Sequence, residues 1–427
     1  MPRHLKILII SHNSFSKVFN NGKTLESIFR AFDKHNLAQI FFSKNEEPDL
    51  DYCNRYFKIT DTAVLKSILK GFSDCGEAIS ADQSNKRINE TEIKKAKPSL
   101  FEFAKSKANY LTLVRDLLWS FNSWKSKSLI NWIQEFKPDV VFYVGGNFGF
   151  SHKIARFVSK KYNLSLVSYF TDDYLIYPIS KNLLEYFQHQ RIKMFYPKTI
   201  NQSSICYSIG ELMANEYSSY FNKDFFPLIN AVEKQDYLQY EPNSNAVMSY
   251  FGGLHLNRWQ MIIKLAKLSS NVTINVYSVT KPRDEILYLF QESKINFKGA
   301  VEGENLQTAI KNSDILLHVE SNDLYNKSLT KLSISTKIPE YLMSGRFILG
   351  FGPDDVASMR ILSDNKIGKV ISSSLSDRQI QIELKNIIAD FLLRDQIGKK
   401  GYDYAVEHFD NNKNAKEFKK QLENLNS

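Results

Sequence analysis

Residues 333–345, SISTKIPEYLMSG, decide how the second half of this sequence is interpreted. They come directly after the run 314–319, DILLHV, a short apolar stretch that predicts a buried strand of a parallel sheet. Pro339 suits the first turn of a helix, where its missing N–H is not needed. Strand-to-helix junctions of this kind bind anions, because free backbone N–H groups and the positive end of the helix point toward the ligand.

The side chains of this junction suit a nucleoside diphosphate. Ser335, Thr336 and Lys337 offer two hydroxyls and a positive charge ahead of the helix. Glu340 places a carboxylate on the same rim, where it can accept hydrogen bonds from the two hydroxyls of a ribose. The sequence therefore predicts a nucleotide-binding loop over these residues.

Strand and helix patterns alternate along the rest of the chain. This alternation predicts an α/β protein with two doubly wound, Rossmann-like domains. A stretch rich in Pro, Asn and charged residues, 227–245, is typical of a linker between them. We therefore divide the chain into 1–232, 233–408 and a terminal segment, 409–427. The predicted strands cover 5–10, 140–144, 164–169 and 205–209, then 247–251, 272–276, 296–297, 315–319, 347–350 and 370–371.

Composition indicates a globular, cytoplasmic protein. With 427 residues and 43% hydrophobic content, the chain can supply a core for each domain. No run approaches the roughly 18 apolar residues of a membrane-spanning helix, and the apolar stretch 5–10 is too short for a signal peptide. Cys53, Cys75 and Cys206 are widely spaced without a C-x-x-C pair, so neither a disulfide framework nor a zinc site is indicated.

The net charge of +10 favours a polyanionic partner. Nucleic acid, anionic lipid and a phosphate-bearing substrate all fit the charge, and a general abundance of lysine explains part of it equally well. No DNA- or RNA-binding motif is visible in the sequence, which argues against nucleic acid.

Several sequence blocks together carry a family resemblance that covers nearly the whole chain. In order and spacing they resemble GT-B glycosyltransferases of the large, mostly retaining family 4 type, in the branch that builds bacterial surface polysaccharides. The blocks are LVRDLLWSFNSW (113–124), FKPDVVFYVGG (136–146), YFTDDY (169–174), YFGGLHLNRW (250–259) and STKIPEYLMSG (335–345).

The resemblance implies roles for two acidic residues. The family signature is E-x7-E, whose second Glu binds the donor ribose; Glu340 matches it, and Gly345 matches the small-residue turn that follows. The position of the first Glu is occupied by Leu332. Glu320, separated from Glu340 by 19 residues, is the nearest acidic candidate for contact with the transferred sugar.

The resemblance also implies how the donor diphosphate is bound. Gly252 and Gly253 let the backbone approach the phosphates, and Arg258 contacts them from the helix that follows, together with Lys337. The family's usual arginine directly after the glycine is Leu254 here. No metal ion or other cofactor is expected, because enzymes of this fold act without one.

Residues of the first domain are assigned to the acceptor side. His12 ends the first predicted strand, and Gly22 matches a family glycine that lies near the donor phosphates or the acceptor; a simple helix-start turn also explains Gly22. Asp172 and Asp173 follow another strand. They can orient or deprotonate the acceptor hydroxyl, or equally cap the following helix.

An aromatic and lysine-rich segment, 94–132, fits a helix at an anionic membrane surface. Packing of the same aromatics inside the domain explains the pattern as well, and residues 76–99 are expected to form an exposed excursion. The pattern rests on Tyr110, Val114, Leu117, Leu118, Phe121, Trp119 and Trp124, with Lys94, Lys95, Lys97, Lys105, Lys107, Lys125 and Lys127 around them.

The resemblance implies a GT-B fold with two domains facing a cleft and a terminal helix, including Ala415, Phe418, Lys419 and Leu422, that returns to the first domain. The implied activity is transfer of a sugar from a UDP-sugar to a lipid-linked or oligosaccharide acceptor, with retention, at the inner face of the cell membrane. A nucleotide-sugar epimerase of the same fold and a non-catalytic glycosyltransferase-like binding module are the alternatives.

Overall fold

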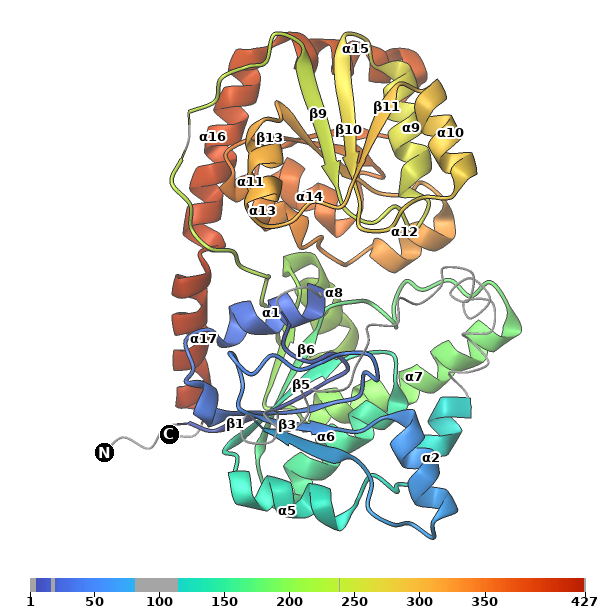
Figure 1. The fold of residues 1–427 in the computed structure, drawn as a ribbon, viewed down its shortest axis with the longest axis vertical. Coiled ribbons are helices and arrows are strands. Elements are labelled where there is room, and N and C mark those ends of the chain that lie inside the picture. The colour runs from blue at the N-terminus through green and yellow to red at the C-terminus, as the bar shows by residue number, and fades with distance from the viewer. Residues whose placement is uncertain (1–4, 17–19, 81–113, 238, 426–427) are drawn as a thin grey trace, which may run out of the picture. The chain divides into compact units, whose positions relative to one another are not determined.

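The computed structural model describes residues 5–16, 20–80, 114–237 and 239–425 (Figure 1). The chain divides into two compact units. Unit 1 contains Met1–Leu228 and Ala415–Ser427, and unit 2 contains Ile229–Asn414. Each unit is built around its own sheet.

Unit 1 contains an eight-stranded sheet with the order β4-β3-β2-β1-β5-β6-β7-β8. All neighbouring strands are parallel except β3 and β4, which are antiparallel. The expected exposed excursion 76–99 is therefore wrong at its start, because 77–80 form β4. Glu77 and Ala78 are exposed and Ile79 and Ser80 are partly exposed, because β4 is an edge strand. The strands are β1 (Ile7–Ser11), β2 (Leu37–Phe41), β3 (Arg55–Lys58), β4 (Glu77–Ser80), β5 (Val140–Gly145), β6 (Ser165–Phe170), β7 (Ile205–Ser208) and β8 (Phe225–Pro227).

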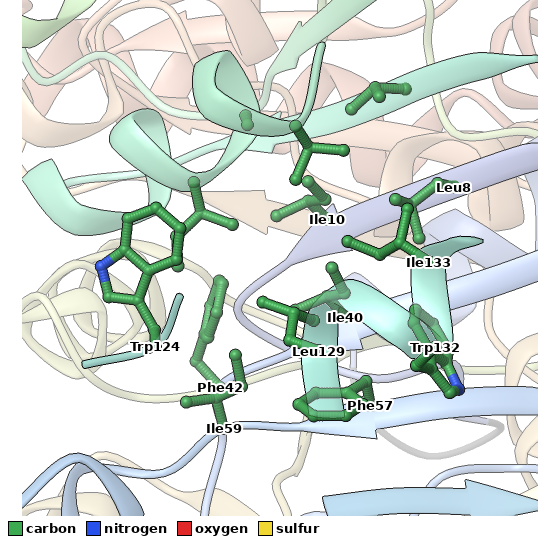
Figure 2. Close-up of a cluster of buried hydrophobic side chains, with 14 of the residues drawn as sticks. Leu8, Ile10, Ile40, Phe42, Phe57, Ile59, Trp124, Leu129, Trp132 and Ile133 are labelled. Carbon is green, nitrogen blue, oxygen red and sulfur yellow. The ribbon is translucent and has the colours of Figure 1, made fainter. Parts of the chain in front are cut away.

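Helices cover the sheet of unit 1, and aromatic side chains fill the core between them. Figure 2 shows part of this core, in which Trp132 of α5 lies near Phe57 of β3, with ring centroids 5.5 Å apart. The helices are α1 (Asn20–Phe29), α2 (Asp61–Leu69), α5 (Lys127–Phe136), α6 (Gly149–Tyr162), α7 (Leu183–Gln202), α8 (Glu211–Phe221) and α17 (Asn411–Asn424), with a short 3-10 helix at Lys34–Asn36.

In the part of the aromatic and lysine-rich segment that the structure describes, some apolar residues are buried and others are exposed. Trp119 and Trp124 are buried in the core, as packing predicts. Residues 114–120 are helical, and Leu117 and Phe121 are exposed by 63% and 54%. Tyr110 and the lysines from Lys94 to Lys107 lie outside the described residues, so the membrane interpretation of this segment stays a prediction.

The C-terminal helix α17 packs on unit 1. Phe418 contacts the rings of Phe29, Phe142 and Tyr207, with centroids 5.7 Å away in each case. The Tyr207 hydroxyl donates to Gln421 Oε1 at 2.6 Å. These contacts explain why residues from Ala415 onward belong to unit 1.

Unit 2 contains a six-stranded, fully parallel sheet with the order β11-β10-β9-β12-β13-β14. The strands are β9 (Ala246–Phe251), β10 (Val272–Tyr277), β11 (Ile295–Gly299), β12 (Ile315–Val319), β13 (Phe347–Gly352) and β14 (Lys369–Ser372). The helices are α9 (Arg258–Leu268), α10 (Asp284–Glu292), α11 (Gly303–Lys311), α12 (Leu324–Thr330), α13 (Lys337–Met343), α14 (Ala357–Asp364), α15 (Asp377–Ala389) and α16 (Phe391–His408).

The two doubly wound sheets confirm the predicted fold class, with one correction at the nucleotide-binding loop. The loop does not follow β12 directly, because α12 lies between them. Asp323 starts this extra helix by accepting a hydrogen bond from the backbone N–H of Asn326 at 2.9 Å. The polar sequence of α12 has no apolar stripe from which a helix could be predicted.

Each sheet has one point where the strand order reverses. In unit 1 this switch point lies between β1 and β5, and in unit 2 it lies between β9 and β12. Open α/β sheets bind ligands outside the carboxyl ends of the strands at such points. Ligand-binding residues are therefore expected directly after these four strands.

No helix in the described part of the chain combines the length and the hydrophobicity needed to cross a bilayer. Cys53, Cys75 and Cys206 are buried free thiols.

Candidate functional site

The switch point of unit 2 brings together four residues predicted from the sequence. Gly252 and Gly253 follow β9, Arg258 is the first residue of α9, and Glu320 follows β12. The two glycines form a close turn, since a Cβ at Gly253 would lie 2.4 Å from the ring of His255. The Tyr250 hydroxyl donates a hydrogen bond to the carbonyl oxygen of Gly253 at 2.7 Å, which holds this turn in place.

Arg258 and Glu320 form a buried ion pair. The Nη2 atom of Arg258 lies 3.1 Å from both carboxylate oxygens, and the two side chains are exposed by only 16% and 3%. Burial raises the pKa of Glu320, and the guanidinium of Arg258 opposes this shift. Burial lowers the pKa of Arg258, but Glu320 and Tyr250 outweigh that effect, so its pKa is raised overall. The sequence assigned these side chains to different parts of the donor, whereas the structure joins them.

His318 belongs to the same cluster and was missed in the sequence. Its Nε2 atom lies 3.5 Å from Glu320 Oε1. Burial and the nearby Arg258 lower its pKa to about 3, which keeps the ring neutral. The histidine lies inside a fully buried, mostly apolar strand, so its place in the sequence gave no signal of function.

A tyrosine attaches the nucleotide-binding loop to this switch point. The Tyr341 hydroxyl accepts a hydrogen bond from the backbone N–H of Phe251 at 3.0 Å, and it lies 3.3 Å from the Phe251 carbonyl oxygen. Phe251 is the last residue of β9 and precedes the glycine turn. Helix α13, which carries Glu340, is thereby held at the carboxyl end of β9. Tyr341 was not assigned a role from the sequence.

Within the loop, the predicted residues contact one another. The backbone N–H of Ser335 donates to Ser358 Oγ at 3.0 Å, and Ser335 Oγ accepts from the backbone N–H of Lys337 at 3.3 Å. The Lys337 ammonium lies 2.7 Å from Glu340 Oε2, with both side chains about one-quarter exposed (26% and 23%). Thr336 precedes α13, and its side chain makes no capping hydrogen bond. The pair of Lys337 and Glu340 is accessible to a ligand.

The switch point of unit 1 has a different composition. His12 follows β1, and its ring lies 5.0 Å from that of Phe148. Arg115 lies over the ring of Phe148 at 4.4 Å and pairs with Asp61 at 2.7 Å. Burial and Arg115 lower the pKa of His12 to about 4, against the influence of Asp61. The block 113–124 contains Arg115, but the sequence pattern in this block was based on its apolar and aromatic residues, and Arg115 was not assigned a role.

Gly22, which the sequence also assigned to the acceptor side, has a packing role. Gly22 lies in α1, and a Cβ there would come within 2.6 Å of both the backbone N and the Cβ of Ser16. It would also lie 2.9 Å from the carbonyl oxygen of Ser14. The contact between α1 and residues 14–16 therefore requires glycine, whether or not a ligand binds nearby.

Asp172 and Asp173 differ sharply in their surroundings. Asp173 is buried and accepts hydrogen bonds from the backbone N–H groups of residues 175, 176 and 177 and from the Tyr217 hydroxyl. The expectation that an aspartate caps the following helix is wrong, because Asn182 caps α7. Asp173 shapes a turn instead. Asp172 is partly exposed and makes long contacts with Thr171 and Tyr174, at 3.3 and 3.5 Å.

Among the residues that the structure describes, no group of three or more His, Cys, Asp or Glu side chains gathers as a metal site would require. Metal independence stays a prediction.

Comparisons with known proteins identify the fold. No protein-family model matches the sequence, and no curated protein is similar to it in sequence. Among solved structures, TarM has a TM-score of 0.62 at 11% identity, with 99% of both chains covered. A complex of S. aureus TarM with fondaparinux, alpha-GlcNAc-glycerol and UDP has a TM-score of 0.52 at 13% identity, covering 70% of this chain and 58% of that chain.

Two further solved structures are similar to this chain over nearly its whole length. HepE of Anabaena in complex with UDP-glucose has a TM-score of 0.60 at 11% identity, with 99% of this chain and 100% of that chain covered. WaaG, a glycosyltransferase involved in lipopolysaccharide biosynthesis, has a TM-score of 0.55 at 11% identity and covers 96% and 98%. The chain therefore has the GT-B fold of these glycosyltransferases.

Proposed function

We propose that this protein is a glycosyltransferase that moves a sugar from a UDP-sugar to a lipid-linked or oligosaccharide acceptor in the synthesis of a bacterial surface polysaccharide. The observation that carries the proposal is the cluster at the unit 2 switch point, where the glycine turn, the Arg258–Glu320 pair and α13 meet. Fold neighbours bound to UDP or UDP-glucose support a nucleotide-sugar donor. WaaG supports a role in surface glycans.

In this proposal the leaving diphosphate is stabilised by positive groups already in position. Arg258 is held in place by Glu320, and Lys337 turns from Glu340 toward the phosphates when the ribose hydroxyls donate to Glu340 instead. The hydroxyls of Ser335 and Thr336 and the backbone at Gly252 and Gly253 contact the same phosphates. Fixed charges in a site shielded from water stabilise developing negative charge without reorganising.

The sugar and acceptor are assigned to the remaining residues. Glu320 contacts the transferred sugar, and Asp172 orients the acceptor hydroxyl near His12. Transfer with retention needs no separate base, because the leaving phosphate oxygen can accept the proton from the acceptor. Asp173 supports this arrangement through the turn that it closes.

We also propose peripheral contact with an anionic membrane, which would give access to a lipid-linked acceptor. The support is the exposure of Val114, Leu117 and Phe121 in unit 1. Replacing Leu117 and Phe121 with Gln should weaken co-sedimentation with vesicles that contain phosphatidylglycerol. Equal sedimentation of variant and wild type would contradict this assignment.

The donor site is tested by titrating UDP into the Glu340→Ala variant. Loss of a hydrogen bond to a charged group should weaken binding by about 2 kcal/mol, or roughly 30-fold, while the fold survives. Glu383→Ala is a matched control, because Glu383 forms a 3.9 Å pair with Lys369 on the same unit and has no assigned role. Unchanged UDP affinity of Glu340→Ala would remove the ribose assignment.

Metal independence is tested by assaying sugar transfer with and without EDTA. Because positive side chains are assigned to the diphosphate, chelation should leave the rate unchanged. A rate that vanishes with EDTA and returns with Mg²⁺ or Mn²⁺ would assign the leaving-group charge to a metal ion.

A further inference from the structure

A pocket of about 420 Å³ in unit 1 has a lining that no part of the proposed donor site shares. Four of its side chains are cationic and none is acidic. The cations are Lys125, Lys153, Arg156 and Lys160, and the aromatic residues beside them are Trp124 and Phe157.

Helix α6 places three of these cations along one side. Lys153, Arg156 and Lys160 are spaced by three and four residues, so they lie on the same face of the helix. Lys153 lies one turn into α6 and Lys160 lies near its end, so this row extends along the helix away from the β1/β5 switch point. Lys125 adds the fourth charge from the segment that precedes α5.

These four charges have no ion-pair partner among the residues that the structure describes. Asp116, the carboxylate that acts on Lys153, is itself paired with Arg191 at 2.7 Å. Burial lowers the pKa of Lys153, and Arg191, Arg156 and Lys125 lower it further while Asp116 opposes them. The pocket therefore concentrates positive charge that the described part of the chain leaves unpaired.

The aromatic residues add order and a hydrogen-bond donor. The Lys125 ammonium lies over the rings of Phe157 and Trp124, at 4.7 and 5.3 Å from their centroids, which restrains the long side chain. Trp124 is 1% exposed, and its indole N–H has no acceptor among the residues that the structure describes. Four cationic side chains and an indole N–H without a hydrogen-bond acceptor favour a ligand with several negatively charged oxygen atoms.

We propose that this pocket binds a phosphate group, carried either by a small phosphomonoester or by the headgroup of an anionic phospholipid. Phosphate offers several charged acceptor oxygens to the guanidinium and ammonium groups that converge here. The site belongs to unit 1 alone, and it requires neither a sugar donor nor catalysis. It is therefore independent of the proposed transferase activity.

The test compares two double variants that remove the same charge. Lys153→Gln/Lys160→Gln changes the pocket, and Lys385→Gln/Lys400→Gln changes two exposed lysines of unit 2 that form no ion pair with any described residue. Inorganic phosphate and glycerol 3-phosphate are titrated by calorimetry. Vesicles of phosphatidylcholine with and without phosphatidylglycerol are tested by co-sedimentation. Thermal unfolding checks that both variants are folded.

We expect the pocket variant to bind the phosphate group at least about tenfold more weakly than wild type, because two charge-assisted contacts are lost, and the unit 2 variant to bind like wild type. Binding of inorganic phosphate or glycerol 3-phosphate to wild type, weakened in the pocket variant, would identify a small phosphomonoester as the ligand. Binding confined to phosphatidylglycerol vesicles, and lost in the pocket variant, would identify a lipid headgroup. Absence of both, or an equal loss in the two variants, would overturn the proposal.

Discussion

The two switch points occupy the same position in similar sheets, yet their residues differ in charge and burial. After β9 and β12, a mostly buried arginine and a buried glutamate neutralise each other. After β1 and β5, a neutral histidine lies against the Phe148 ring, and the nearby ion pair of Arg115 and Asp61 is partly exposed. Equivalent topology therefore leaves the chemistry of each site to the loops.

This difference agrees with the division of labour that we propose. A diphosphate requires fixed positive charge, which the unit 2 switch point holds in the form of Arg258 balanced by Glu320. An uncharged sugar hydroxyl requires shape, hydrogen bonds and apolar ring faces, which the unit 1 switch point supplies. The comparison can be tested by removing one residue at a time from each side.

The largest effect is expected from Asp173→Ala in unit 1. The substitution leaves three backbone N–H groups and the Tyr217 hydroxyl without their acceptor, so we expect the free energy of unfolding to fall by about 4 kcal/mol. Urea unfolding followed by tryptophan fluorescence measures this, because Trp119, Trp124 and Trp132 are all buried in unit 1.

Asp172→Ala is the matched variant at the neighbouring position. Asp172 is partly exposed, and its contacts with Thr171 and Tyr174 are long, so stability should change less than in Asp173→Ala while the rate of sugar transfer falls. A variant of Asp172 that is as unstable as Asp173→Ala, or one with an unchanged transfer rate, would contradict the separation of roles between the two aspartates.

At the unit 2 switch point, Arg258→Ala should cost about 3 kcal/mol of stability, because it leaves a buried carboxylate without its partner. The pKa of Glu320 is raised already by burial and should rise further in the variant. A folded-state pKa above the unfolded value means that stability is lost as pH rises, so the defect should be larger at pH 8 than at pH 5. Hydrogen exchange of the β9 and β12 amides at pH 5 and pH 8 measures this loss of stability.

An exposed pair in the same unit is the control for Arg258→Ala. Arg360 and Asp364 lie 3.3 Å apart with side chains exposed by 50% and 57%, and Arg360→Ala should cost less than about 0.5 kcal/mol. UDP affinity should fall only in Arg258→Ala. Equal losses of stability in the two variants would contradict a special structural role of the Arg258–Glu320 pair. Undisturbed UDP binding in Arg258→Ala would contradict its role in donor binding.

Much of the framework was predictable because it depends on local patterns. Short apolar runs gave the strand of β12 at its observed bounds, and they gave β5, β9 and β10 to within one residue. Leu25, Ile28 and Phe29 recur at helical spacing, and all three are buried in α1. Edge strand β4 was missed because its exposed side chains carry no apolar alternation.

The candidate site was less predictable, because its contacts join residues that are distant in the sequence. Nothing near Arg258 indicates that its partner is Glu320, 62 positions later. Tyr341 reaches Phe251 across 90 positions, so its hydroxyl could not be assigned from the sequence. Asp172 and Asp173 are identical in type, and only the fold determines which one is buried.

Gly22→Ala tests whether the unit 1 glycine is explained by packing. The added methyl group would overlap the backbone at Ser16 and Ser14, so we expect a loss of about 2 kcal/mol, the usual cost of overpacking. Gly146→Ala is the control, because a Cβ at Gly146 meets no atom within 4 Å. Full stability of Gly22→Ala together with loss of donor or acceptor binding would restore the ligand-contact role that the sequence suggested.

The smallest effect concerns the pH dependence of unit 1. The pKa of His12 is lowered from 6.5 to about 4, first by burial and then by Arg115, with Asp61 opposing. The unfolded chain therefore binds the proton more readily, and the folded state loses stability as pH falls below 6.5 toward 4. Because the ring is partly exposed, we expect this group to account for only about 1 kcal/mol between pH 7 and pH 5. His12→Asn should remove that contribution, so urea unfolding curves measured across this range should show a flatter pH dependence than wild type. Parallel dependences in the two proteins would mean that His12 titrates alike in the folded and unfolded states, and the switch point of unit 1 would then be as hydrated as the surface.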